Sequence, residues 1–302
     1  MIEFDKVSVR FGPAEAVRGV SVTIPAGALA VLVGPSGSGK TTLLRLVNRM
    51  ATPSAGQVRV RGEDVAAADP ARLRRSIGYV MQSMGLFPHW SVARNIGTVP
   101  ALLGWPQPRI AARVEELLAL VRLDPALAQR RPAALSGGQA QRVGLARALA
   151  ADPDILLMDE PFGAVDPIVR RELRAELTRI HAATGKTILL VTHDPIEALE
   201  LATHLVVLRE GQLVAAGEAA ALAAPPAPPF LRALFGPEAL ALRRLSLLRA
   251  GDAALDGPAP EGAPAIAPEA SLAEAWTLMQ EQGAPVLALG ARHLPWSALL
   301  PR

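Results

Sequence analysis

The chain has 302 residues, half of them hydrophobic, which is enough for one large domain with a sizeable core and a small appendix. It contains no cysteine, so disulfides and thiolate metal sites are excluded, and no apolar run reaches the roughly 18 residues that suggest a membrane span. The net charge of +3 comes from scattered arginines with few aromatic residues, which favours solvated surfaces over a nucleic-acid-binding face.

The N-terminal third predicts a sheet followed by a buried strand. Residues 2–10 and 19–24 alternate apolar and polar side chains, as half-exposed strands do. Residues 28–33 form a continuous apolar run, typical of a fully buried strand, and a helix is expected over 40–50. A further strand is expected at 77–80.

A glycine-rich loop lies between that buried strand and that helix. It reads Gly34-Pro35-Ser36-Gly37-Ser38-Gly39-Lys40-Thr41, matching G-x-x-x-x-G-K-[ST], and Thr42 follows. Glycines in this pattern let backbone N–H groups turn onto phosphate oxygens, the lysine reaches the β- and γ-phosphates, and the threonine hydroxyl ligates Mg²⁺. The loop therefore predicts binding of a nucleoside triphosphate.

The middle of the chain alternates helices and buried strands. Residues 89–150 are expected to be mostly helical, including a helix over 109–121. Buried strands are expected at 155–158 and 187–191, with a helix over 167–184 between them. This alternation predicts a largely parallel α/β core with a helical insertion.

The C-terminal part begins with a proline-rich connector at 223–229 and a short helix at 230–235. Farther on, Ser271 and Glu274 form a capping box, and Gly283 is a plausible C-cap before a strand at 285–289. The helix between them carries one apolar face, which we interpret as core: Leu272, Ala275, Trp276 and Met279.

A second motif, Leu135-Ser136-Gly137-Gly138-Gln139, precedes the apolar strand that ends in Asp159-Glu160. Together with the glycine-rich loop, this order resembles an ABC nucleotide-binding domain. The resemblance implies a P-loop NTPase (RecA-like) α/β domain over 1–235, with an antiparallel β subdomain and a helical subdomain at about 89–151. Residues 236–302 would form a C-terminal tail.

The resemblance implies ATP and Mg²⁺ as cofactors and gives roles to particular residues. Phe11 would stack on adenine. Glu160 would act as general base on the attacking water, with His193 on the γ-phosphate and Lys40 and Gln82 also catalytic. Thr41, Gln82 and Asp159 would hold Mg²⁺. We expect Asp159 and Glu160 to point to opposite faces of their strand. The nucleotide-binding set would be Phe11, Gly34, Pro35, Ser36, Gly37, Ser38, Gly39, Lys40, Thr41, Thr42, Ser136, Gly138, Gln139 and Asp166.

In ABC dimers, each ATP lies between the P-loop of one subunit and the LSGGQ helix of the other. Ser136 begins that helix here, and a helix N-terminus favours phosphate. Gly163-Ala164-Val165-Asp166 fits the D-loop, which crosses the same interface, with Val165 in place of the usual leucine. A homodimer is therefore implied.

Several short segments resemble the ATPase subunits of importers for glycine betaine, choline, carnitine and proline. They are residues 73–80, 85–89, 95–100 and 104–105. Transmembrane permease subunits would be partners, a substrate-binding protein would act through the complex, and no nucleic acid is expected. The chain would be peripheral on the cytoplasmic face of the plasma membrane. The alternatives are an importer of an amino acid or another small solute and, less favoured, a soluble ABC ATPase.

Two features depart from those relatives. Arg94-Asn95 stands where they usually have Glu-Asn, which reverses a charge near the expected permease dock. Such relatives often end in a pair of cystathionine-β-synthase-type (CBS) domains, whereas this tail holds at most one CBS-like unit, at 264–300. We interpret it as a truncated dimerisation element, and a vestigial tail is the alternative.

Overall fold

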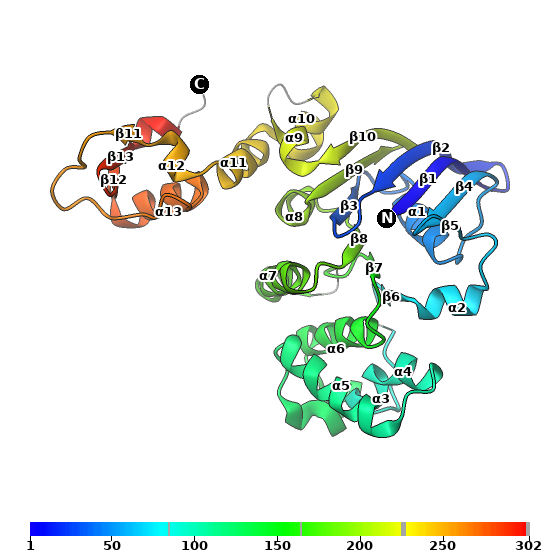
Figure 1. Cartoon of the computed structure of the whole chain (residues 1–302). Coiled ribbons are helices and arrows are strands. Elements are labelled where there is room, and N and C mark those ends of the chain that lie inside the picture. Colours follow the sequence, from blue (N-terminus) through cyan, green and yellow to red (C-terminus); the bar gives the residue numbers. More distant parts are fainter. Residues whose placement is uncertain (84, 164, 225–227, 300–302) are drawn as a thin grey trace. The chain divides into compact units, whose positions relative to one another are not determined.

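The computed structural model (Figure 1) describes residues 1–83, 85–163, 165–224 and 228–299. The chain divides into two compact units, Met1–Gly217 and Glu218–Arg302. This division falls earlier than the boundary expected after residue 235, because helices α9 (Ala219–Ala223) and α10 (Pro229–Phe235) both contact α11 (Pro237–Leu247). Pro225, Pro226 and Ala227 of the expected connector lie outside the described residues.

The first unit begins with a four-stranded antiparallel sheet in the order β2-β1-β4-β5. Its strands are β1 (Ile2–Phe11), β2 (Ala14–Ile24), β4 (Ala55–Val60) and β5 (Glu63–Asp64). The expected alternation holds in β1 but changes phase once. Ile2 and Phe4 are buried, and then Val7 and Val9, because the register shifts between Phe4 and Val7, where Lys6 adopts a φ of 47°.

A six-stranded sheet of order β10-β9-β3-β8-β7-β6 forms the centre of this unit. Its strands are β3 (Leu29–Val33), β6 (Ile77–Val80), β7 (Ile155–Asp159), β8 (Thr187–Val191), β9 (His204–Arg209) and β10 (Gln212–Glu218). The pairs β6–β7, β7–β8, β8–β3 and β3–β9 are all parallel. The expected parallel core is confirmed, and β9 and β10 are strands that the sequence analysis did not assign.

Helices connect these strands and form the predicted insertion. Their bounds are α1 (Lys40–Val47), α2 (Pro70–Arg75), α3 (Val92–Ile96), α4 (Thr98–Leu102), α5 (Gln107–Leu120), α6 (Gly137–Leu149), α7 (Pro167–Thr184) and α8 (Pro195–Leu201), with short 3₁₀ turns at Pro125–Gln129 and Pro132–Ala134. Helix α7 has the predicted limits. Helix α1 is shorter than expected because it ends at Val47, with Asn48 as its C-cap, before Arg49 with a φ of 55°.

The second unit has its own small core. Besides α9–α11 it contains α12 (Ala250–Ala253), α13 (Leu272–Gln282) and a three-stranded antiparallel sheet. The sheet, ordered β11-β13-β12, consists of β11 (Leu255–Asp256), β12 (Val286–Leu289) and β13 (Arg292–Pro295), and a 3₁₀ turn follows at Trp296–Leu299. The capping box at Ser271 and the left-handed C-cap at Gly283 are confirmed.

The apolar face of α13 is only partly core. Leu272, Ala275 and Met279 are buried in the cluster of the second unit, whereas Trp276 is 38% exposed. The interpretation of Trp276 as core was therefore wrong. Its position on the helix is at one edge of the buried stripe, where a large ring reaches solvent.

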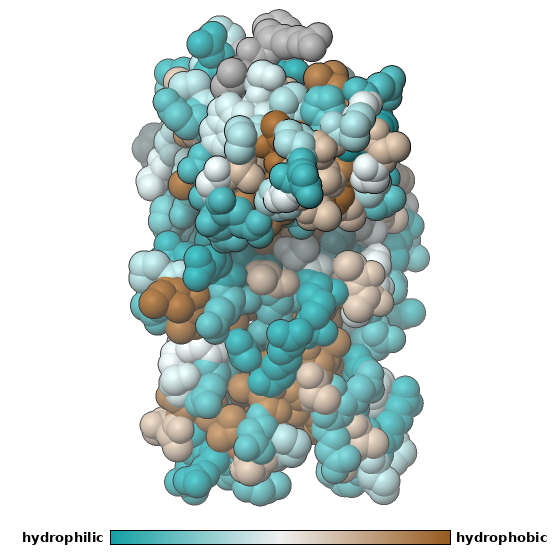
Figure 2. Space-filling model, turned by 90° about the vertical axis from the view of Figure 1, so that its left-hand side faces the viewer, coloured by the Kyte–Doolittle hydropathy of each residue, from teal (hydrophilic) through white to brown (hydrophobic). Residues whose placement is uncertain are grey.

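Among the described residues, no helix is both long and apolar enough to cross a membrane. On the face shown in Figure 2, hydrophilic residues cover most of the surface and hydrophobic residues are interspersed among them.

The capping box predicts a measurable local stability. Ser271 Oγ accepts a hydrogen bond from the Glu274 amide, and the Glu274 carboxylate accepts bonds from the Ser271 amide and hydroxyl. We expect Ser271→Ala to lower the opening free energy of α13 by about 1 kcal/mol, measured by amide hydrogen exchange.

The same box gives a pH dependence. Hydrogen bonds from Ser271 hold the pKa of Glu274 below its ordinary value. A lowered folded-state pKa contributes stability above the unfolded pKa of about 4.3, and that stability is lost as pH falls through the folded value. The deficit of Ser271→Ala should therefore shrink in acid, and a deficit that is constant from pH 7 to pH 3 would contradict this account.

Candidate functional site

The glycine-rich loop after β3 takes a shape that side chains would obstruct. A Cβ at Gly34 would lie 2.0 Å from the Leu208 carbonyl oxygen, and a Cβ at Gly39 would lie 2.5 Å from the Ala16 carbonyl oxygen. Both glycines have φ values in the region that favours glycine, 153° and 92°. The loop is thus held closely between β9 and β2, and it delivers the chain into the first turn of α1.

Lys40, the first residue of α1, is folded back over this loop. Its Nζ donates hydrogen bonds to the carbonyl oxygens of Gly34 at 2.7 Å and Pro35 at 2.8 Å, and the residue is only 6% exposed. Burial lowers the pKa of Lys40, and the nearby carboxylates of Glu160 and Asp159 oppose this shift. A partly desolvated cation in a glycine-rich loop is suited to an anionic ligand.

The next residue joins α1 to the end of β7. Thr41 Oγ1 donates a hydrogen bond of 2.9 Å to Asp159 Oδ1, and Asp159 is buried. Arg45 Nη2 lies 3.6 Å from the other carboxylate oxygen. The Thr41 hydroxyl and the Asp159 carboxylate therefore meet at the first turn of α1.

Glu160 follows Asp159 but has left the strand. Its φ of 45° turns the chain, although its amide still donates to the Val191 carbonyl at 3.0 Å. We expected both carboxylates to lie within the strand and to be separated by its pleat, and this was wrong. The strand ends at Asp159, and the turn separates the two side chains.

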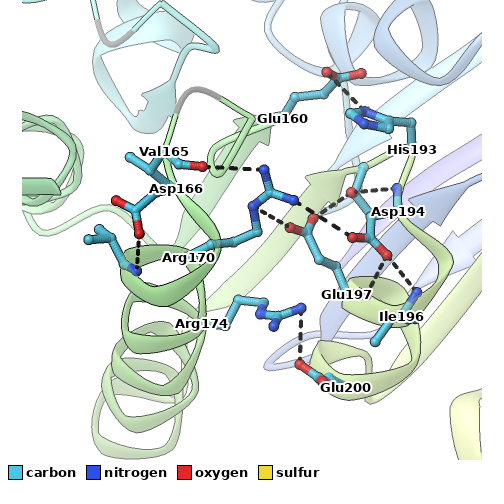
Figure 3. Close-up of polar contacts among 12 residues, drawn as sticks. Glu160, Val165, Asp166, Arg170, Arg174, His193, Asp194, Ile196, Glu197 and Glu200 are labelled. Atoms are coloured by element: carbon cyan, nitrogen blue, oxygen red, sulfur yellow. Dashed lines mark hydrogen bonds and ion pairs between the residues drawn. The ribbon is translucent and has the colours of Figure 1, made fainter. Parts of the chain in front are cut away.

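Two side chains from two other loops converge on the Glu160 carboxylate. Gln82 Nε2 donates to Glu160 Oε2 at 3.0 Å, and His193 Nδ1 lies 3.2 Å from the same oxygen. Figure 3 shows the Glu160 and His193 side chains pointing toward one another. Gln82 comes two residues after β6 and His193 two residues after β8, so parallel pairing brings both to the edge where β7 ends.

Phe11 is the last residue of β1 and is 59% exposed, so its ring is not part of the core. It pairs with Ala14 across the β1–β2 hairpin, and Ala16 of the same hairpin contacts Gly39. An exposed aromatic ring therefore lies on the hairpin that contacts the loop.

The remaining predicted residues form a second group. Ser136 caps α6 in a capping box with Gln139, and Asp166 caps α7 by accepting from the amides of Ile168 and Val169. Gly138 packs against Val169, where a Cβ would lie 2.7 Å from Val169 Cγ1. Among the described contacts, none joins this group to the loop at 34–42, and Figure 1 shows α6 beside α5 and apart from α1. Ala164 lies outside the described residues.

Arg45, which pairs with Asp159, was not predicted from the sequence. Its spacing gave a signal, because residues four apart on a helix share a face, and Arg45 stands four residues after Thr41. Thr192 and Glu197 were not predicted either; the Thr192 hydroxyl donates a hydrogen bond of 2.6 Å to the Glu197 carboxylate beside His193. The sequence signal for this pair would have been Glu197 itself, an acidic residue on the buried face of the short helix α8.

Known proteins resemble the chain over most of its length. The sequence profile of the family described as ABC transporter matches residues 17–163. The glycine betaine uptake system ATP-binding protein of Escherichia coli K12 is 48% identical over 287 residues, covering 95% of this chain and 93% of that protein. The glycine betaine/carnitine/choline transport ATP-binding protein of Bacillus subtilis 168 is 43% identical over 250 residues, 82% of this chain and 66% of that protein.

A solved structure also resembles this chain. It is a dimeric post-hydrolysis state of an ATP-binding cassette bound to ADP and Pi, with a TM-score of 0.64 and 29% identity. The match covers 72% of this chain and 99% of that one.

The packing of α6 on α7 gives a prediction that needs no assumption about ligands. Gly138→Ala forces a methyl group against Val169, whose branched side chain has little rotamer freedom, whereas a Cβ at Gly137 meets nothing closer than 3.8 Å. We expect Gly138→Ala to be less stable than Gly137→Ala by about 1–3 kcal/mol in denaturant unfolding. Adding Val169→Ala should remove most of this difference, and an unchanged difference would show that the contact does not decide it.

Proposed function

The chain belongs to the ATP-binding subunits of the ABC transporter family, and we propose that it hydrolyses ATP to drive import of an osmoprotectant. The solute class is that of glycine betaine, choline and carnitine, because these are the solutes named for two of its relatives. The observation that carries the enzymatic part is the Glu160 carboxylate, held between Gln82 and His193 at the end of β7.

The residues of the site fit ATP with Mg²⁺. The loop from Gly34 to Gly39 supplies backbone amides, and Lys40 supplies a buried positive charge. The oxygens of Thr41, Asp159 and Gln82 are hard donors of the kind that Mg²⁺ prefers. The described residues contain no group of three or more His, Cys, Asp or Glu that could hold a metal. Phosphate oxygens and water would therefore complete the coordination shell of Mg²⁺. Bound Mg²⁺ would neutralise charge on the phosphates.

The other side chains of the site bind the nucleotide and take part in its hydrolysis. Phe11 stacks on the adenine ring, and Ser36, Gly37, Ser38 and Thr42 line the phosphates. Glu160 accepts the proton of the attacking water, whose oxygen bonds to the γ-phosphorus as the bond to the ADP oxygen breaks. Gln82 holds the Glu160 carboxylate by a hydrogen bond. His193 donates a hydrogen bond to the γ-phosphate.

The second group of residues would act on the ATP of another copy. Ser136, Gly138, Gln139 and Asp166 have no described contact with the loop of their own chain, and α6 presents its N-terminus, which favours phosphate. A head-to-tail homodimer would place them against the partner's nucleotide. The dimeric state of the related cassette supports this assembly.

The transport partners follow from the family. Two permease subunits would hold the dimer at the cytoplasmic face of the membrane, and a substrate-binding protein would supply the solute through them. Arg94 is the candidate contact to the permease. Its Cζ lies over the Trp90 ring, 4.3 Å from the ring centroid. No nucleic acid is required. The second unit, which contains α13 and a three-stranded sheet, would serve as a truncated CBS-like element that pairs in the dimer.

Glu160→Gln tests the catalytic assignment. The amide keeps the shape of the side chain but loses its basicity, so we expect turnover to fall by about 10²–10⁴-fold while ATP still binds. Sizing with Mg·ATP should show a long-lived dimer. Glu172→Gln on the surface of α7 is the matched control and should retain turnover, and hydrolysis by Glu160→Gln at the wild-type rate would remove Glu160 from this role.

The solute is tested in the assembled importer. ATPase activity of the chain reconstituted with its permease should rise when the binding protein is loaded with glycine betaine, choline, carnitine or proline. Glutamine, an unrelated small solute, serves as the control. Stimulation by glutamine alone would place the chain with importers of another solute.

A further inference from the structure

Arg170 on α7 joins two segments that are far apart in the sequence. Its Nη2 donates a hydrogen bond of 3.3 Å to the Val165 carbonyl, just before α7 begins. Its Nη1 lies 3.9 Å from Asp194 Oδ2, and its Nε lies 3.8 Å from Glu197 Oε1, at the start of α8 (Figure 3). One planar guanidinium therefore contacts both the D-loop and the helix that follows His193.

The segment around His193 is tied into a closed set of hydrogen bonds. Thr192 Oγ1 donates to Glu197 Oε2 at 2.6 Å and accepts from the Asp194 amide at 3.0 Å. Asp194 Oδ1 accepts from the amides of Ile196 and Glu197. The backbone on both sides of His193 is thus fixed to α8, so a shift of Glu197 shifts the base of the His193 side chain.

The Glu197 carboxylate is buried, so its charge depends on the polar and charged groups around it. It is only 4% exposed, and burial raises its pKa, while the Thr192 hydroxyl and the guanidinium groups of Arg174 and Arg170 lower it. A buried carboxylate is tolerated when it is paired and hydrogen-bonded. Glu197 Oε2 accepts from Thr192, and Oε1 faces Arg170.

We propose that Arg170 is a positioning residue that couples the D-loop, through Glu197 and Asp194, to the placement of His193 against Glu160. Arg170 touches no reacting atom. A second copy that presses on Val165 and Asp166 would move the Arg170 guanidinium, and α8 would carry that shift to His193. The inference rests on the proposed function, because it uses the roles given there to Glu160 and His193.

Arg174 provides a matched control within the same pair of helices. It lies one turn after Arg170 on α7 and pairs with Glu200 of α8 at 3.1 Å. It also lowers the pKa of Glu197, yet it has no described contact with Val165. An effect shared by variants at both positions would reflect the charge beside Glu197, whereas an effect confined to Arg170 would reflect the link to the D-loop.

The test compares Arg170→Ala and Arg174→Ala in the full chain, by ATPase kinetics and amide hydrogen exchange. We expect Arg170→Ala to lower kcat by about tenfold or more with little change in KM, because misplacement of a group far from the chemistry is costly. Exchange should accelerate at 165–169 and at 193–197 together. Arg174→Ala should show neither change. Arg170→Lys should fall between, since one compact ammonium cannot reproduce the geometry with which three guanidinium nitrogens contact the carbonyl and both carboxylates.

Several results would overturn the inference. Equal losses of kcat in the two alanine variants, or faster exchange in only one of the two segments, would show that Arg170 stabilises the fold without coupling. If Arg170→Ala does not fold, the same criteria apply to Arg170→Lys. A wild-type chain without ATPase activity would refute the proposed function itself, whereas an active chain indifferent to Arg170→Ala would refute only the coupling.

Discussion

A parallel sheet brings the carboxyl ends of all its strands to one edge, and every catalytic candidate of the first unit depends on that geometry. The order β3-β8-β7-β6 places the glycine-rich loop, His193, Glu160 and Gln82 after four consecutive strands of the sheet. Neighbouring strands are about 5 Å apart, so side chains of ordinary length bridge their ends. The contacts of Glu160 with Gln82 and His193 are such bridges.

The buried charges at this edge of the sheet have partners within the protein itself. Lys40 is buried with carbonyl oxygens as its hydrogen-bond acceptors, and Asp159 is buried with Thr41 as donor and Arg45 as counter-charge. Burial penalises the charge of Lys40, and the nearby carboxylates of Glu160 and Asp159 offset part of the penalty. A polyphosphate would add negative charge next to Lys40 and so would offset more of the cost of burying that charge.

The two units differ in how they are stabilised. The first has two sheets that share one large cluster of buried residues with α1. The second has a much smaller cluster, built on α13 and its short sheet, and small cores are marginal. Local devices carry more weight there: the capping box at Ser271, the C-cap at Gly283 and the bonds from Arg292 to the Gly251 and Ala254 carbonyls.

The sequence by itself determined the local features of this protein. Periodicity and capping residues were sufficient for the limits of α7 and the ends of α13, and the two motifs were sufficient for the family, because these signals lie within a few residues of one another. It did not place Arg170 against Glu197 or Arg45 against Asp159, nor did it show that Glu160 leaves the strand or that Trp276 is exposed. These outcomes depend on strand order and helix packing, which bring together residues more than a hundred positions apart in the case of Arg45 and Asp159. Only the tertiary structure decides them, because a side chain acquires such partners only after the whole sheet has assembled.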